Sequence, residues 1–246
     1  MLTFKVNEQS LPKQLFCGLV VCDSILTFHD VTGYYVFNRV FDTTREESIP
    51  NWYASILLFC IALTCLVTYA IQRRRVDPRD ARPWVFFAGF FTFLSMDDGA
   101  KIHERLGSFF RELAEDGDGV FTAFQPVLEA ASTYSWQIFV LPVFLFCAFF
   151  ILLWGFNNIS VRETHRWILL GGFFIAIGLG LDYFEGLVDN EVIDLEGMTL
   201  SARAIGHYQR VLEEFSEMTG FICILRGLWV HLISLETHIS LSLYKS

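Results

Sequence analysis

Charged residues are scarce in this sequence, and their scarcity excludes an ordinary soluble fold. Only 18% of the 246 residues are Asp, Glu, Lys or Arg, and 53% are hydrophobic, whereas a soluble domain carries about 25% charged residues. Proline is rare, with six residues, and the 17 glycines are scattered, which excludes collagen-like and proline-rich chains. Aromatic residues make up 16% of the chain, too many for a disordered protein. This composition, with a mean hydropathy of +0.43, is typical of a multipass membrane protein.

Basic residues are too few and too dispersed to bind nucleic acid. The chain has 18 Lys and Arg residues against 27 Asp and Glu, a net charge of -9, and binding to phosphates needs a clustered basic face. None of the six cysteines forms a Cys-x-x-Cys pair, so a thiolate zinc site is not indicated. His103 and Glu104 open like a zinc protease helix, but residue 107 is glycine where the second histidine is required. No nucleotide, haem or flavin motif occurs, and no catalytic residue is assigned.

Six segments are apolar and long enough to cross a membrane as helices. A helix needs about 20 mostly apolar residues to span the roughly 30 Å hydrocarbon layer. Tryptophan lies near the ends of most of these segments, as it does at membrane interfaces. We therefore predict a single integral membrane domain over 1–246, an all-α bundle of six transmembrane helices with the approximate spans 15–38, 52–71, 84–106, 136–156, 167–187 and 211–231.

The basic residues predict the orientation of the bundle. The connection between the second and third spans reads RRRVDPRDARP, and cytoplasmic loops hold an excess of Lys and Arg. That loop is therefore expected in the cytoplasm, which places both termini there as well. We expect the protein in the inner (plasma) membrane of a bacterium, with the lipid bilayer as its partner. A homo-oligomer and a membrane protein partner are both compatible with the sequence.

Two ionisable residues lie deep within the predicted spans. Asp23 in the first span and Arg226 in the sixth reach similar depths, because the two helices run in opposite directions. An ionisable group in a span costs about 2.5–3.5 kcal/mol on insertion scales and usually has a partner. We predict that Asp23 and Arg226 form a buried ion pair that fixes the first helix against the sixth. A role in proton movement is the alternative.

Acidic residues gather at the outer ends of three spans. The third span ends in SMDDGAKIHERLG, the fifth ends in GLGLDYFEG and the sixth begins with HYQRVLEEFSEMTG. Residues three or four apart share a helix face, so carboxylates and two histidines are expected at one depth. The candidate metal ligands are Asp98, His103, Asp182, Glu185, His207, Glu214 and Glu217. A secondary polar cluster comprises Asp97, Lys101, Glu104, Asp30 and Glu213.

This crowding of carboxylates predicts a bound cation. Neighbouring carboxylates cannot all be ionised and unpaired, because each negative charge disfavours ionisation of the next. Lys101 and partial protonation neutralise part of the charge, and a divalent metal would neutralise more. Carboxylates with one or two imidazoles suit zinc, iron or manganese, and helical bundles bind such metals with inward-facing carboxylate and histidine side chains. The spacing is compatible with such a site but is not diagnostic of it.

Three functions fit these features. The first is a metal-dependent membrane enzyme that acts on a lipid or other amphiphile from the extracytoplasmic side. The second is a cation or proton transporter or channel that uses the acidic cluster as its outer vestibule. The third is a non-catalytic subunit that docks a partner. The first is favoured because the cluster lies at one level, while the inner halves of the second to fifth spans offer few polar groups.

Overall fold

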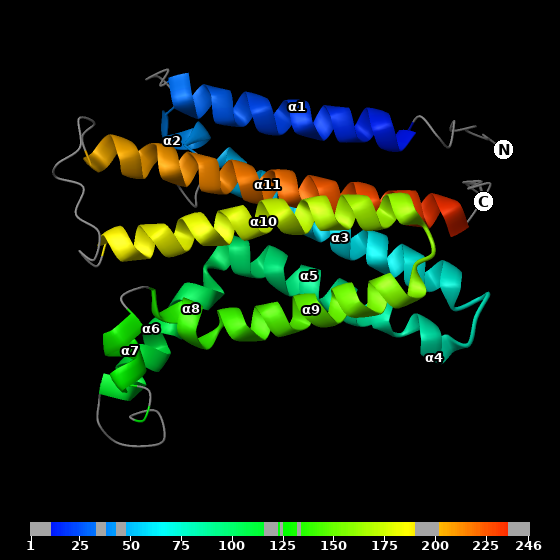
Figure 1. Cartoon of the computed structure of the whole chain (residues 1–246). Helices are drawn as coiled ribbons and strands as arrows, with labels where there is room; N and C mark the ends of the chain where they lie inside the picture. Colours follow the sequence, from blue (N-terminus) through cyan, green and yellow to red (C-terminus); the bar gives the residue numbers. More distant parts are fainter. Residues whose placement is uncertain are drawn as a thin grey trace, which may run out of the picture.

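The protein is a bundle of helices. The computed structural model describes residues 11–32, 38–42, 48–115, 123, 125–131, 134–189 and 202–235, and within these residues there is no β-strand. The long helices lie roughly along one direction, and most of the short helices gather at one end of the bundle (Figure 1). The elements are α1 (Leu11–Thr32), α2 (Asn38–Phe41), α3 (Ile49–Gln72), α4 (Pro78–Ala81), α5 (Pro83–Ala100), α6 (Ile102–Glu115), α7 (Gln125–Ala131), α8 (Ser135–Phe139), α9 (Leu141–Asn158), α10 (Arg162–Asp189) and α11 (Ala202–Leu235).

Five of these helices are long and apolar enough to cross a membrane. They contain the segments Lys13–Val31, Ile49–Gln72, Leu141–Asn158, Arg162–Val188 and Gly206–Leu235. The prediction of an all-α chain is confirmed for the described residues, and these five helices are consistent with a multipass membrane protein, one fewer than the six predicted spans. The predicted third span has its counterpart in α5, which is as long as α9 but ends with two adjacent carboxylates, Asp97 and Asp98.

Proline and capping residues define the start of α3 and the turn that leads from its other end to α5. Ser48 caps the start of α3 by accepting a hydrogen bond from the Asn51 backbone N–H at 3.3 Å. At the other end of α3, Asp77 caps the short helix α4, and Pro83 opens α5. The two long helices α3 and α5 therefore run antiparallel and pack against each other.

Glycine brings α10 and α11 into close contact. A Cβ atom at Gly171 would lie 2.7 Å from the Gly220 carbonyl oxygen, and one at Gly220 would lie 2.7 Å from the Ile175 side chain. Small residues of this kind let membrane helices pack backbone to backbone. The closely packed α10/α11 pair is flanked by α3 and α1, which both contact α11.

The best-buried apolar side chains lie where α3, α5 and α11 meet. Trp84 of α5 is 1% exposed there, and its indole N–H donates to Gln72 Oε1 at 2.8 Å. The ring of His231 stacks on Trp84 with a centroid distance of 5.3 Å. The other fully buried large side chains of this core are Leu57, Leu58, Ile61, Met218, Ile222 and Leu225.

Two predicted spans are divided in the structure. The segment 84–106 breaks at Lys101, which adopts a left-handed conformation with φ 49° and separates α5 from α6. The segment 136–156 breaks at Val140, because Pro142 cannot continue a preceding helix and instead lies in the first turn of α9. Both breaks lie at the same end of the bundle, where α6, α7 and α8 gather (Figure 1).

Candidate functional site

A cavity of about 490 Å³ lies between the long helices. Its walls come from α3, α5, α9, α10 and α11, and its volume falls in the range of about 300–1,000 Å³ that is typical of ligand pockets. Helix α9 forms one wall and reaches α5 through ring contacts, such as Phe90 with Phe144 at 6.3 Å and Phe87 with Phe150 at 6.5 Å. These large side chains keep α9 at a distance from α5, which leaves the space of the cavity.

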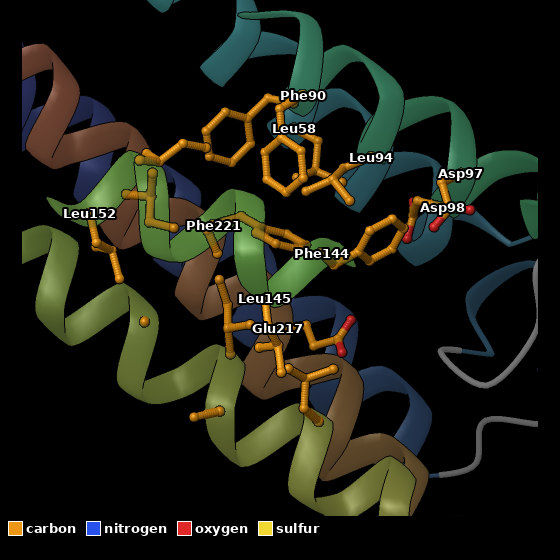
Figure 2. A pocket seen from close by; sticks show the side chains of 18 of the residues that line it. Leu58, Phe90, Leu94, Asp97, Asp98, Phe144, Leu145, Leu152, Glu217 and Phe221 are labelled. Atoms are coloured by element: carbon orange, nitrogen blue, oxygen red, sulfur yellow. The ribbon is translucent and has the colours of Figure 1, made fainter. Parts of the chain in front are cut away.

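The cavity is polar at one end and apolar along the rest of its length. Figure 2 shows Asp97, Asp98 and Glu217 toward one end and Leu152 toward the other, with phenylalanine and leucine side chains between them. The cavity therefore has one polar end and a long apolar part, as a lipid has a polar head and an apolar tail. The charged and imidazole side chains that line it are Asp97, Asp98, Lys101, His103, Glu104, His165, Asp182, Glu213, Glu214 and Glu217, and all but His165 belong to the polar end.

The turn at Lys101 folds His103 back onto Asp97. The backbone N–H of His103 donates to Asp97 Oδ1 at 2.7 Å, and its ring Nδ1 lies 2.7 Å from Oδ2 of the same carboxylate. Asp97, only 4% exposed, thus caps the start of α6 and orients the imidazole. Trp136 holds the other side of the ring, with a centroid distance of 4.6 Å.

Neighbouring carboxylates favour the protonated form of His103. Burial lowers the pKa of this imidazole, but the hydrogen bond to Asp97 and the negative charges of Asp97, Glu104 and Asp182 raise it, and the raising effects prevail. The pKa of His103 is therefore above its ordinary value of 6.5. His103 can act as a cation toward the carboxylates of this end.

Two uncharged side chains hold carboxylates of the polar end. Ser55 of α3 donates its hydroxyl to Asp98 Oδ2 at 2.5 Å, and Gln137 of α8 donates to Asp182 Oδ2 at 2.6 Å. Sequence reasoning missed both residues, because a serine or glutamine within an apolar stretch has no spacing signal. The only sequence signal near Gln137 is the adjacent tryptophan, a residue type that is common at membrane interfaces.

The structure brings together most of the predicted metal ligands. Asp98, His103, Asp182, Glu214 and Glu217 line the same cavity. Four members of the secondary cluster line it too, namely Asp97, Lys101, Glu104 and Glu213.

The remaining predicted residues lie apart from that cavity. Glu185 accepts a hydrogen bond from Arg210 Nε at 2.5 Å, and His207 Nε2 lies 3.9 Å from Asp30 Oδ1. Among the described residues, no three His, Cys, Asp or Glu side chains are arranged to hold a metal ion. The structure thus brings these side chains into one polar region without arranging three of the described ones as metal ligands.

The family to which the chain belongs is defined over nearly all of this bundle. Residues 15–232, which include all the candidate site residues, match the model of a family described as domain of unknown function DUF8692. The chain belongs to the DUF8692 family. No match to this DUF8692 protein is found among curated proteins or among solved structures.

The predicted ion pair between Asp23 and Arg226 is not formed. Asp23 instead accepts a hydrogen bond from the Thr219 hydroxyl at 2.9 Å. Arg226 lies 3.8 Å from Glu163 Oε1 and stacks over the Trp167 ring at 4.2 Å. The physical reason is depth, because Thr219 and Arg226 are two turns apart on α11, about 10 Å at 1.5 Å per residue.

Proposed function

We propose that this protein binds a membrane amphiphile inside the helix bundle. The observation that carries the proposal is the cavity, which is lined by apolar side chains along α5, α9, α10 and α11 and by carboxylates and His103 at one end. A hydrocarbon chain among the phenylalanine and leucine side chains exchanges lipid contacts for van der Waals contacts with the protein. A polar head at the carboxylate end keeps its hydrogen bonds.

The length of the cavity suits a hydrocarbon chain. His165 and Asp182 of α10 both line it, and the 17 positions that separate them correspond to a rise of about 25 Å along the helix at 1.5 Å per residue. The hydrocarbon layer of a membrane is roughly 30 Å thick. A chain that starts at the polar end therefore extends beyond the middle of the membrane, so we propose a ligand with a long, single tail.

The charges at the polar end indicate the kind of head group. Seven carboxylates line that end, while its cations are Lys101, which is paired with Glu104 at 2.9 Å, and His103. An excess of acceptors and negative charge favours a head group that carries donors or positive charge. Amine-bearing and hydroxyl-rich amphiphiles meet this requirement.

We further propose that α5 is the sixth transmembrane helix. It lies antiparallel to α3, which is itself apolar enough to span a membrane, and their connection carries Arg73, Arg74, Arg75, Arg79 and Arg82. In Figure 1, α1 begins and α11 ends at the end of the bundle where this connection lies. The excess of arginine there favours a cytoplasmic location for it and for both termini.

A metal-dependent reaction on the head group is a second candidate function. It is favoured by the contact of His103 Nδ1 with Asp97, because histidines that bind metals usually donate their other ring N–H to a carboxylate. In neutral His103 with its proton on Nδ1, Nε2 is left for a metal, with Asp98, Asp182 and Glu217 as neighbouring carboxylates. Zinc, iron or manganese at this point would supply a Lewis acid that activates water.

Two matched glycine variants test the binding proposal. Gly172 lines the cavity, and a Cβ atom there meets no other atom within 4 Å, so Gly172→Leu fills empty space in the cavity. Gly180 is equally unobstructed but is exposed on α10 outside the cavity, so Gly180→Leu is the control. The amphiphile bound to detergent-purified protein is extracted and identified by mass spectrometry.

We expect the parent and Gly180→Leu to retain the same amphiphile, and Gly172→Leu to lose it at least several-fold. Equal retention in all three proteins would contradict the proposal. The metal candidate is tested on the same preparations by inductively coupled plasma mass spectrometry. Stoichiometric metal that disappears in folded Asp98→Asn and Glu217→Gln proteins supports it, and no metal after reconstitution contradicts it.

A further inference from the structure

Asp23 is a fully buried carboxyl group away from the cavity. Its side chain is 0% exposed between α1 and α11, and its Oδ2 accepts the hydrogen bond from Thr219. Its Oδ1 has no hydrogen-bond partner among the described residues. Tyr53 of α3 is close enough to Asp23 for an electrostatic interaction, but its hydroxyl donates to the Leu19 carbonyl oxygen at 2.9 Å instead. One oxygen of this buried carboxyl group thus has no hydrogen-bond donor among the described residues.

A second oxygen near Asp23 is also unused. Hydroxyl groups within helices commonly donate to the carbonyl oxygen four residues earlier, and Ser24 does so to Val20 at 2.8 Å. Thr27 does not, since its buried Oγ1 has no partner among the described residues. Thr27 lies one helical turn after Asp23 and therefore on the same face of α1.

Thr219 completes the group from the neighbouring helix. Ser216 of α11 donates to the Leu212 carbonyl oxygen at 2.7 Å, as expected of a helical hydroxyl. Thr219, three residues later, gives up that bond and turns toward Asp23. Asp23 and Thr219 thus share one buried contact between α1 and α11, and the unpaired Thr27 Oγ1 lies one turn along the same face of α1.

The charge of this group selects the ligand. An ionised carboxylate in a membrane bundle needs a partner charge, and Arg226 is displaced by two turns and stacks on Trp167. Carboxylate and hydroxyl oxygens are hard ligands that suit alkali and alkaline-earth cations. The site offers one negative charge, so a monovalent cation neutralises it, whereas a divalent cation would leave a positive charge in apolar surroundings.

We propose that Asp23, Thr27 and Thr219 bind a monovalent cation of the sodium type between α1 and α11. The cation joins Oδ1 of Asp23 and the Thr27 hydroxyl of α1 to the Thr219 hydroxyl oxygen of α11, and so fixes α1 on the bundle. Helix α1 packs chiefly against α11, while its side chains Val21, Ile25 and Phe28, which are 55%, 60% and 69% exposed, face the lipid. This site does not depend on the amphiphile cavity.

Thermal unfolding of the detergent-purified full chain tests the proposal. The Tm is measured in NaCl and in choline chloride at equal ionic strength and pH. We expect Na⁺ at a hundred times its Kd to raise the Tm of the parent by about 5–10 °C. Asp23→Asn, whose amide oxygen can still accept from Thr219, and Thr27→Val are expected to lose this rise. Ser24→Ala removes a hydroxyl beside the site that already donates to the Val20 carbonyl oxygen, so this variant is expected to keep the rise of the Tm in Na⁺.

Three results would overturn the proposal. The first is a parent Tm that is equal in NaCl and in choline chloride. The others are a full Na⁺ effect in Asp23→Asn and loss of the Na⁺ effect in Ser24→Ala. If Asp23→Asn does not fold, Thr27→Val and Thr219→Val decide the matter, because neither removes a charge. A Na⁺ effect retained in Gly172→Leu separates this site from the amphiphile cavity.

Discussion

Gly178 of α10 lies directly against Glu217 of α11. A Cβ atom at position 178 would be 2.6 Å from Cγ of Glu217 and 3.1 Å from its Oε1. At Gly171 and Gly220, the lack of a side chain lets the two helices approach each other. At Gly178 it leaves space for Glu217, a carboxylate that lines the cavity. Helix packing and the position of a site residue are therefore set by one kind of residue along α10.

Gly178→Ala is expected to displace Glu217 and to destabilise the protein. Forcing a methyl group into packed surroundings costs typically about 1–3 kcal/mol. Gly180→Ala is the matched control, because a Cβ atom at Gly180 meets no atom within 4 Å and alanine favours a helix by roughly 0.5–1 kcal/mol. The two variants should shift the Tm in opposite directions. Equal shifts would show that Gly178 is not needed for the position of Glu217.

The left-handed backbone at Lys101 gives a second prediction. Outside glycine, this conformation costs roughly 1–2 kcal/mol, and for β-branched residues it is rarer still. Lys101→Gly and Lys101→Val both remove the ion pair with Glu104. The difference between their free energies of unfolding therefore measures the cost of the left-handed backbone at this position. We expect the glycine variant to be the more stable by at least about 1 kcal/mol in chemical or thermal unfolding. A valine variant of equal stability would mean that α5 and α6 do not require this turn.

Much of this architecture can be predicted from the sequence, because apolar segments and their polar ends are local properties. The bundle of apolar helices follows from segments of about 20 apolar residues. The common location of Asp98, Asp182 and Glu217 follows from their places near one end of three helices. Topology alone brings such residues to one level of the membrane.

Other features depend on distances that spacing does not determine. Asp23 and Arg226 were expected to pair because they reach similar depths. In the structure, Asp23 lies beside Thr219, two turns before Arg226 on α11, and accepts a hydrogen bond from its hydroxyl. Glu185 and Asp182 share a helix face, but Arg210 binds the first while Gln137 binds the second. The cavity itself arises from the separation between α9 and α5, which no single helix encodes.

The stability of the protein is expected to depend on pH through His103. The pKa of this imidazole is raised above 6.5 in the folded protein. Its stabilising contribution is therefore fully present below about pH 6.5 and is lost as the pH rises through the folded-state pKa. The Tm difference between the parent and His103→Gln, measured across this range, should shrink toward alkaline pH. A difference that is constant or that grows with pH would contradict the raised pKa.

Asp97 is expected to contribute in two separable ways, as the cap of α6 and as the charge beside His103. Asp97→Asn retains an oxygen that accepts the His103 backbone N–H, whereas Asp97→Ala removes both contacts. Loss of a helix cap costs about 0.5–2 kcal/mol, so the alanine variant should be the less stable of the two by roughly this amount. Both variants remove the negative charge, so in both the pKa of His103, followed by NMR of its imidazole, should fall. Equal stability of the two variants would exclude the capping role, and an unchanged His103 pKa would exclude the electrostatic one.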